Sequence, residues 1–490
     1  MSGNKLYDVI VVGAGPGGSS AATFAAKQGL STLLVDRADF PRDKVCGDGL
    51  TPQAIYWLDR LGCVDEVLTL TKSCIKTCDL FINGELVLSG GFPPNTSYPD
   101  FCILLDRRRF DHVLVMNAVA SGAEFLPHCA VRSIRQNRDH IDAVADVGRQ
   151  ATVLKARVVI GADGVSSVIS RSIGNALNDG ATAISLRTYY RNVRMDGAQI
   201  KVYFDTGFFP GYGWVFVDDE GFANIGLGYA FDKPFPMQSQ LKRTFDVFLQ
   251  NELADLLAGA DRCGPVAGGV VSFYRPRAIV DDRVMLVGDA ANQADPLNGG
   301  GIHKAMESAY LAAQAAGRAV ASGDYSAQAL RWYQERWEEQ YELDWRTAEL
   351  FLSIAKNPDL RDVCLFVLAG IARLTTSDRQ FQEFCSGVFS GVISQSSCLV
   401  PRALFHALPR DPHSWASLLK MDRHGMLRGP VTVLAEASKN LAQASGRLIQ
   451  NPWQSLDWGM EVSAKFLRLV DGQIGGPMSP RRVFAAPPVS

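Results

Sequence analysis

The sequence predicts an α/β fold in which a parallel-sheet domain carries an inserted antiparallel-sheet domain and leads into a helical C-terminal region. Three observations carry this prediction. A strand, a glycine-rich turn and a helix open the chain, two stretches that alternate apolar and polar residues follow, and the pattern turns helical from about residue 301. The length of 490 residues leaves room for two or three domains, and an apolar fraction of 47% is ample for large cores.

The opening stretch, "YDVIVVGAGPGGSSAATFAAKQGLSTLLVD", predicts a strand over residues 7–12, a helix over 16–28 and a second strand over 32–35. Gly13, Gly15 and Gly18 complete the pattern G-x-G-x-x-G in the first turn. Glycines at these positions allow a tight turn, close approach of the backbone to a pyrophosphate and close packing of helix on strand.

Asp36 ends the second predicted strand, where its carboxylate can accept hydrogen bonds from a ribose. The strand before the glycines, the helix after them and an acid about 20 residues further on together predict a Rossmann-like dinucleotide site. A glycine-rich turn without a ligand is the alternative.

The alternating stretches interrupt this domain. We expect a discontinuous nucleotide-binding domain over residues 1–70, 106–183 and 276–325, with an antiparallel-sheet substrate domain over 71–105 and 184–275. A helical C-terminal region over 326–470 and a flexible tail over 471–490, rich in Pro and Gly, complete the chain.

A second glycine cluster, "VMLVGDAANQADPLNGGGI", again reads as strand, turn and helix. Asp289 follows the strand and can hold a sugar-like hydroxyl, while Gly299, Gly300 and Gly301 open a helix whose bare N–H groups suit an anion. FAD needs both features, because its ribityl chain is a polyol and its reduced ring carries negative charge. The pair of glycine clusters therefore predicts FAD rather than NAD alone.

The composition gives no reason to expect several classes of binding partner. The formal net charge of −2 gives no reason to expect nucleic acid, and the cysteines and seven His show no metal-ligand spacing, so no metal site is expected. We expect a cytoplasmic protein, since no signal sequence opens the chain and the apolar run 363–374 is too short to span a bilayer. Peripheral contact with the inner membrane stays open.

The two glycine clusters and "GADG" at residues 161–164 resemble the para-hydroxybenzoate hydroxylase-type FAD-dependent oxidoreductases, which include monooxygenases and reductases. The resemblance implies that Asp289 and Arg107 contact FAD. The full set of expected cofactor-binding residues is Gly13, Ala14, Gly15, Gly18, Asp36, Arg37, Cys46, Gly47, Arg107, Val131, Gly288, Asp289, Pro296, Gly299, Gly300, Gly301 and Ile302.

Three further motifs, "PRDKVCGDGLTP", "FPGYGWVF" and "DPLNGGGI", are similar to the geranylgeranyl reductase branch of that superfamily, especially its bacterial menaquinone-reductase-like members. The resemblance implies that the loop Cys-Gly-Asp-Gly-Leu at residues 46–50, called the Cys46 loop below, lies beside the flavin. It also implies an isoprenoid pocket lined by Tyr212, Trp214 and Phe216. Alternate residues of a strand share one face, so these three aromatic rings would form an apolar wall. Ordinary sheet core is the alternative.

Two positions depart from that branch. Gly300 stands where Glu is common, and Val217 stands where the aromatic motif commonly ends in Pro. Loss of a carboxylate beside the flavin would alter proton delivery or substrate choice.

We expect an enzyme that reduces a carbon–carbon double bond of a large apolar, isoprenoid-like substrate, with hydride from flavin N5. Cys46, Tyr212 and Trp214 are the candidate catalytic residues, with the Cys46 thiol or the Tyr212 hydroxyl as proton source. The electron donor stays open among NAD(P)H, ferredoxin and another reductase. One alternative is a monooxygenase or related tailoring enzyme that acts through a flavin hydroperoxide. Another is a non-catalytic FAD protein that binds a partner, or itself, through the C-terminal region.

Overall fold

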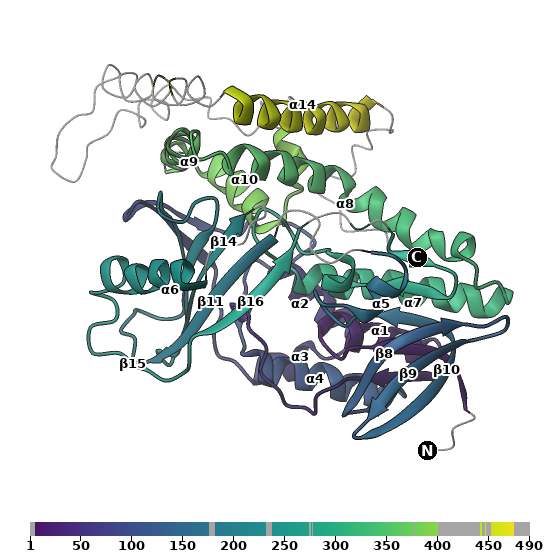
Figure 1. Cartoon of the computed structure of the whole chain (residues 1–490). Coiled ribbons are helices and arrows are strands. Elements are labelled where there is room, and N and C mark those ends of the chain that lie inside the picture. Colours follow the sequence, from purple (N-terminus) through teal and green to yellow (C-terminus); the bar gives the residue numbers. More distant parts are fainter. Residues whose placement is uncertain are drawn as a thin grey trace.

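The computed structural model describes residues 5–175, 182–231, 238–273, 276, 278–376, 378–399, 442, 446 and 452–474. Figure 1 shows two sheets side by side, with the helices that follow the second glycine cluster lying across them. The predicted α/β class is confirmed, and the space between the sheets is where the candidate site is found.

The first sheet contains the strands of the opening motif. Its order is β17-β18-β10-β1-β2-β7, and the five strands from β18 to β7 are parallel. The central strand β1 buries Val9 to Val12, as its β-branched sequence predicts. The bounds are β1 Leu6–Val12, β2 Thr32–Val35, β7 Glu124–Leu126, β10 Gln150–Gly161, β17 Val280–Asp281 and β18 Val284–Leu286.

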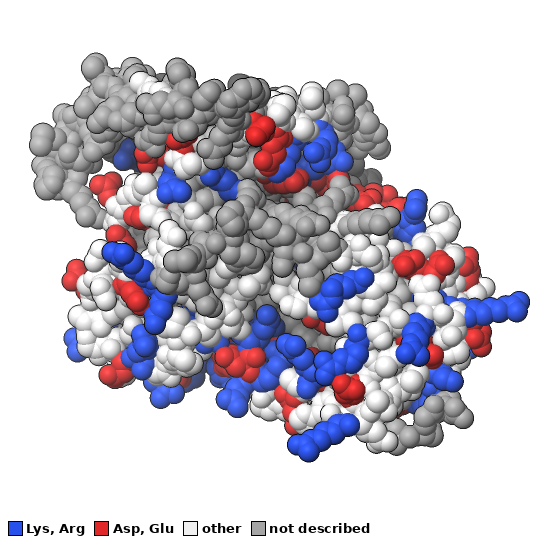
Figure 2. Space-filling model, viewed as in Figure 1, with Lys and Arg blue, Asp and Glu red and all other residues white. Residues whose placement is uncertain are grey.

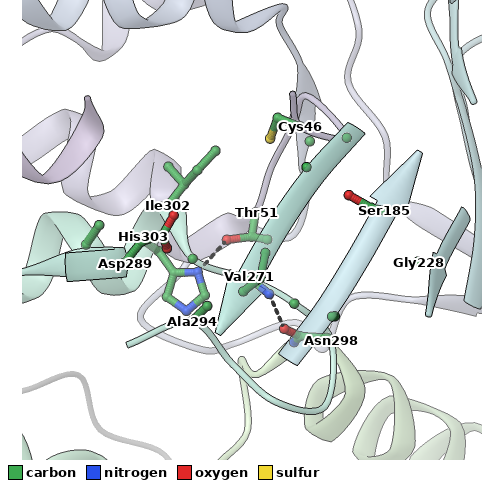
Figure 3. Close-up of a pocket in the computed structure, with 18 of the residues that line it drawn as sticks. Cys46, Thr51, Ser185, Gly228, Val271, Asp289, Ala294, Asn298, Ile302 and His303 are labelled. Carbon is green, nitrogen blue, oxygen red and sulfur yellow. Dashed lines mark hydrogen bonds between the residues drawn. The ribbon is translucent and has the colours of Figure 1, made fainter. Parts of the chain in front are cut away.

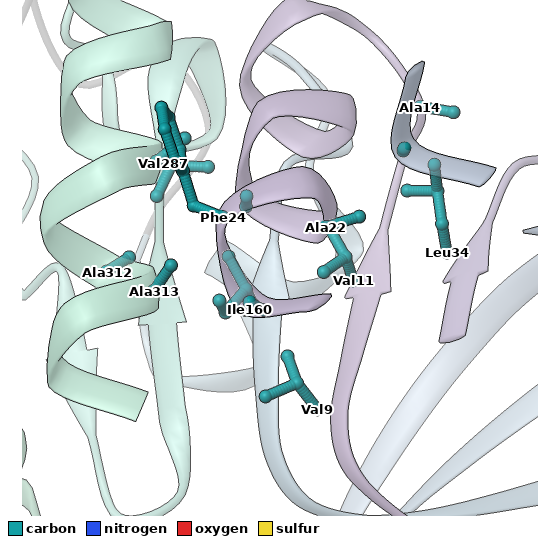
Figure 4. Close-up of a cluster of buried hydrophobic side chains, with 14 of the residues drawn as sticks. Val9, Val11, Ala14, Ala22, Phe24, Leu34, Ile160, Val287, Ala312 and Ala313 are labelled. Atoms are coloured by element: carbon teal, nitrogen blue, oxygen red, sulfur yellow. The ribbon is translucent and has the colours of Figure 1, made fainter. Parts of the chain in front are cut away.

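Three helices, α1 (Pro16–Lys27), α4 (Arg107–Ala120) and α7 (Ile302–Ser322), pack around this sheet. Figure 4 shows Ala22 and Phe24 of α1 in the core with Ala312 of α7. Because alanine side chains are short, α1 and α7 approach each other closely. The two glycine clusters, which begin these two helices, are thereby brought together.

Short elements connect the first sheet to the rest of the fold. β8 (Cys129–Gln136) and β9 (Ile141–Val147) continue β10 as an antiparallel ribbon. β3 (Gly49–Leu50) pairs with β6 (Ile103–Leu104), which holds the Cys46 loop next to the start of α4. The remaining elements here are α2 Pro52–Leu61, α3 Val64–Thr69, α5 Val168–Ser172 and the short 3-10 turn η2 Gly288–Ala291.

The second sheet has the order β15-β11-β14-β13-β12-β4-β5, with β16 also on β11. One pair departs from the predicted antiparallel pattern, since β4 and β12 run parallel. These two strands come from separate excursions of the chain, so no hairpin sets their relative direction. The bounds are β4 Thr77–Ile82, β5 Glu85–Gly91, β11 Thr182–Arg191, β12 Gln199–Phe204, β13 Tyr212–Val217, β14 Ala223–Phe231, β15 Asp261–Arg262 and β16 Ala267–Ser272.

One face of the second sheet is covered by α6 (Gln238–Val247; Figure 1) and the short π-helix η1 (Phe248–Glu252). Val215 and Leu227 point into this core and are fully buried against Phe248 and its neighbours. Because successive side chains of a strand alternate between faces, Tyr212, Trp214 and Phe216 point to the opposite face, toward the first sheet.

The C-terminal region is helical as expected. α8 (Ala327–Ala355) lies on α7, α9 (Arg361–Thr375) and α10 (Arg379–Ser390) pack against β5, and η3 (Gln395–Leu399) returns to α8. The helix α14 (Pro452–Ile474) packs on α8, so residues 471–474 of the expected flexible tail are helical instead. The rest of that tail, and most of residues 400–451, lie outside the described residues.

None of the described helices is both long enough and apolar enough to cross a membrane. The division into domains predicted from the sequence stays a proposal, although the two sheets on which it was based are both present. Both signs of charge are interspersed over the face shown in Figure 2.

Candidate FAD and substrate site

A cavity of about 1110 Å³ lies between the two sheets and extends beneath the C-terminal helices. It is lined by all the predicted site residues except Ala14 and Gly18. Residues from both glycine clusters, from the Cys46 loop and from β13 thus meet around one space, although they lie up to 289 positions apart (Gly13 to Ile302).

The three glycines of the first motif have different neighbours. A Cβ atom at Gly18 would lie 1.7 Å from the carbonyl oxygen of Gly13, and one at Gly13 would lie 2.4 Å from the carbonyl oxygen of Ala162. The fold itself therefore requires these two glycines. A Cβ at Gly15 would meet only the Arg42 guanidinium, at 3.8 Å, and Gly15 lines the cavity. Protein packing does not require Gly15, whereas a ligand lying against its backbone would.

Two helix N-termini face the same cavity. Gly15 is the N-cap residue of α1 and Gly301 that of α7, and neither start carries a side-chain cap. The first N–H groups of a helix lack partners within it, so two uncapped ends offer donors and a positive dipole end to anionic groups. This arrangement fits FAD, which has a pyrophosphate and a ring that becomes anionic on reduction.

Asp36 lies at the carboxyl end of β2, is nearly buried, and lines the cavity. One of its oxygens accepts the Ala14 N–H at 2.7 Å and the other accepts the Ala38 N–H at 2.8 Å. Ala14 is therefore tied to the carboxylate rather than exposed to the cavity. Each carboxylate oxygen retains a second lone pair, which a ribose hydroxyl could use.

The second glycine cluster is organised by the buried residue Asp295. One of its oxygens accepts the Leu297 N–H at 2.8 Å, and the other accepts the Lys304 ammonium at 2.7 Å. Gln395 of η3 donates to both oxygens. Burial raises the pKa of Asp295, but Lys304 and the hydrogen bonds outweigh it and keep that pKa below its usual value. The loop that opens α7 is thus fixed from both α7 and the C-terminal region.

The Cys46 loop lies directly on the aromatic wall. A Cβ at Gly47 would lie 2.9 Å from the Phe216 ring, so only glycine permits this approach. Burial raises the pKa of the Cys46 thiol, while Arg107, which hydrogen-bonds to it, acts in the opposite direction. Arg107 is itself held in a bidentate ion pair with Asp111, at 2.7 and 2.8 Å.

The three predicted wall residues form a row of neighbouring rings. Ring centroids lie 6.1 Å apart for Tyr212 and Trp214 and 6.5 Å apart for Trp214 and Phe216. The Tyr212 hydroxyl donates to the Asn298 carbonyl at 2.6 Å, and burial raises its pKa further above its usual range. Its proton is therefore engaged with the second glycine cluster.

The cavity has an apolar arm that the sequence did not predict. Side chains of α8, α9 and α10 line it opposite β4, β5 and β12, so the C-terminal region contributes directly to the site. Contacts between these helices and strands depend on tertiary packing, and only the helical periodicity was visible in the sequence. The apolar lining includes Leu80, Leu88, Phe204, Phe209, Phe351, Leu352, Leu368, Ala372, Phe384, Val388 and Phe389.

His303 also lines the cavity without having been predicted from the sequence. It follows Ile302 in the first turn of α7, lies 3.4 Å from the Thr51 hydroxyl, and borders the cavity together with Cys46 (Figure 3). Burial lowers its pKa to about 3, so the imidazole is neutral in the folded protein. No local pattern marks a single histidine at a helix start as a site residue.

A Rossmann-type first sheet, two uncapped helix starts on one cavity and the open space beside Gly15 fit an FAD-dependent oxidoreductase. A family model described as an FAD binding domain matches residues 6–202. Digeranylgeranylglycerophospholipid reductase 1 of Methanopyrus kandleri is 32% identical over 374 residues, covering 74% of this chain and 94% of that protein. The chain belongs to the geranylgeranyl reductase family of FAD-dependent oxidoreductases.

Two further relatives agree. The menaquinone reductase of Mycolicibacterium smegmatis is 31% identical over 393 residues, covering 75% of this chain and 91% of that protein. The crystal structure of a geranylgeranyl bacteriochlorophyll reductase-like protein from Thermoplasma acidophilum superposes with a TM-score of 0.66 at 27% identity, covering 75% of this chain and 91% of that one. The predicted family and cofactor are confirmed.

Proposed function

We propose that this enzyme reduces a carbon–carbon double bond in the isoprenoid chain of a lipid or quinone. The observation that carries the proposal is the apolar arm of the cavity. The described residues that β12, α8 and α9 contribute to it include no ionisable side chain. A long hydrocarbon chain suits such an arm, because burying apolar surface is its main source of affinity.

FAD would be held by the residues that fit it. Gly15 and the start of α1 would meet the pyrophosphate, Asp36 the ribose, Asp289 the ribityl chain, and the backbone of Gly299 to Ile302 the flavin ring. When bound, reduced FAD supplies hydride from N5 to one carbon of the alkene. The protein holds the alkene against the cofactor and excludes water from the arm.

Cys46 would supply the proton to the other alkene carbon. Because burial raises its pKa, the thiol is protonated at neutral pH and available as an acid. The thiolate left after transfer would be stabilised by the Arg107 guanidinium and by the backbone N–H of Asp48, both of which hydrogen-bond to Cys46. Tyr212 would act mainly as part of the apolar wall, because its hydroxyl already donates to the Asn298 carbonyl.

Exposed apolar side chains on α14 offer a surface for contact with a membrane. Met460, Phe466 and Leu467 of α14 are 56%, 53% and 61% exposed, which is unusual for large apolar side chains on one helix. We include in the proposal a peripheral membrane contact through this surface, because an isoprenoid lipid would reach the enzyme from a bilayer. Sedimentation with phospholipid vesicles, compared with a Phe466→Ser, Leu467→Ser variant, tests that contact.

Product analysis tests the proposed reaction. The flavin is reduced with dithionite under anaerobic conditions, geranylgeranyl diphosphate, which has no quinone ring to accept the electrons, is added, and the product mass is measured. We expect products heavier by two hydrogens for each bond reduced. Leu368→Arg, which puts a charge in the arm, should abolish them, while Val367→Arg on the exposed side of the same helix should not. Equal activity of both variants would remove the arm from the substrate site.

A further inference from the structure

The Cys46 loop contains one residue whose conformation calls for explanation. Asp48 has a φ of +65°, in the left-handed region that favours glycine, and it stands between Gly47 and Gly49. A third glycine would adopt this conformation with less strain. The contacts of the aspartate side chain therefore explain why it is there. The residue is 4% exposed and does not line the cavity, so these contacts are with the protein itself.

The Asp48 carboxylate is held by the second sheet. One oxygen, Oδ2, accepts the Tyr189 hydroxyl at 2.7 Å and the Asn224 amide at 2.7 Å. Tyr189 lies on β11 and Asn224 on β14, so two strands of the substrate sheet hold a loop that belongs to the FAD part of the fold. The other oxygen, Oδ1, is buried and has no hydrogen-bond partner among the described residues.

Asn224 also holds Cys46 itself. Its amide nitrogen donates to the Cys46 carbonyl at 2.7 Å as well as to Asp48. The orientation of this amide is fixed by Trp214, whose indole N–H can only donate and lies 3.0 Å from the Asn224 oxygen. Gly226 of β14 leaves room for the Trp214 ring, because a Cβ there would lie 2.0 Å from the indole.

We infer that Asp48 and Asn224 are positioning residues that anchor the Cys46 loop to the substrate sheet and so fix the thiol between FAD and the substrate arm. The inference rests on the proposed function only for the role given to Cys46. Trp214 then acts through Asn224 as well as through its ring. The backbone N–H of Asp48 hydrogen-bonds to the Cys46 sulfur, so the contacts that hold Asp48 also hold this donor in place.

The anchor predicts which substitutions matter. Asp48→Gly tolerates the φ angle but removes the carboxylate, and Asn224→Leu removes the amide. Asp48→Asn should preserve the anchor, because its amide oxygen can accept both hydrogen bonds and its NH₂ replaces the oxygen that has no partner. If Asp48 instead relayed protons, Asp48→Asn would be as damaging as Asp48→Gly.

The test measures alkylation of Cys46 by iodoacetamide in the FAD-saturated enzyme, quantified by mass spectrometry of the Cys46 peptide. Losing a hydrogen bond to a charged group should let the loop open more often, so Asp48→Gly and Asn224→Leu should react about ten-fold to a hundred-fold faster than wild type. Loss of the Asp48 charge lowers the pKa of Cys46 in both Asp48 variants, so alkylation rates are compared per thiolate, and on that basis Asp48→Asn should react within about three-fold of wild type. This readout does not depend on ene reduction, so it stands even if the proposed reaction is wrong.

The matched control is Asn175→Leu. Asn175 is also buried and bonds to a backbone carbonyl at 2.8 Å, that of Ala278, but its hydrogen bonds do not reach the Cys46 loop. It should lower thermal stability while leaving Cys46 alkylation unchanged. Unchanged alkylation in Asp48→Gly, or equally fast alkylation in Asp48→Asn and Asp48→Gly, would overturn the inference. These two variants decide the question even if Asn224→Leu does not fold.

Discussion

Two glycines of the first motif should respond in opposite ways to substitution by alanine. At Gly18 the added Cβ would lie 1.7 Å from the Gly13 carbonyl oxygen, so α1 must shift, at a cost of about 3 kcal/mol. At Gly15 it would meet only Arg42, at 3.8 Å, and the φ of −74° already suits alanine. We therefore expect Gly15→Ala to change stability by less than about 0.5 kcal/mol.

FAD affinity should reveal what the Gly15 position is for. The methyl group would project into the cavity where the pyrophosphate is proposed to lie, which should weaken FAD binding at least about ten-fold, or 1.4 kcal/mol. Thermal unfolding of the flavin-free protein and titration with FAD, followed by flavin fluorescence, separate the two effects. Gly15→Ala that binds FAD like wild type, or that unfolds as early as Gly18→Ala, would refute the assignment.

Three further predictions follow from buried groups. Burial lowers the pKa of His303 to about 3, so only the unfolded chain takes up this proton as the pH falls below 6.5. Stability should drop by about 2 kcal/mol between neutral pH and pH 5 through this residue, and urea titrations of His303→Gln should lack that part of the slope. Lys304→Met leaves the Asp295 carboxylate buried without its cation and should cost about 3–5 kcal/mol, partly recovered when Asp295→Asn is added in a double-mutant cycle. Leu227→Ala should cost about 2–5 kcal/mol in the core under α6 without changing FAD affinity, and a weaker FAD complex would show that this face of the sheet also shapes the site.

The cofactor end of the site could be predicted because its signals are local. In the first cluster, Gly13, Gly15 and Gly18 follow a strand directly at the G-x-G-x-x-G spacing, and in the second cluster Gly288 follows a strand while Gly299 to Gly301 precede a helix. Gly18 illustrates the limit of the pattern, since it allows α1 to pack closely on the turn after β1, as the motif predicts, while its expected contact with FAD stays a prediction. A motif identifies the site without assigning each of its residues.

The substrate end depends on contacts that no local pattern encodes. Asn224 is one polar residue in an otherwise apolar strand, and nothing before the fold shows that it faces Cys46, 178 positions away. Phe351 and Leu368 look like ordinary helix residues until α8 and α9 are placed over β4 and β5. The parallel pairing of β4 with β12 also depends on tertiary contacts, because only the assembled sheet determines it.

The central claim is that reduced FAD in this protein passes its electrons to an isoprenoid double bond. Its most direct test is anaerobic stopped-flow: dithionite-reduced enzyme is mixed with geranylgeranyl diphosphate or with its fully saturated analogue, and flavin absorbance is followed. We predict reoxidation with the unsaturated chain, none with the saturated one, and a much slower rate in Cys46→Ala. Flavin that stays reduced with every chain and reoxidises only when oxygen is admitted would contradict the account and favour an oxygen-using enzyme.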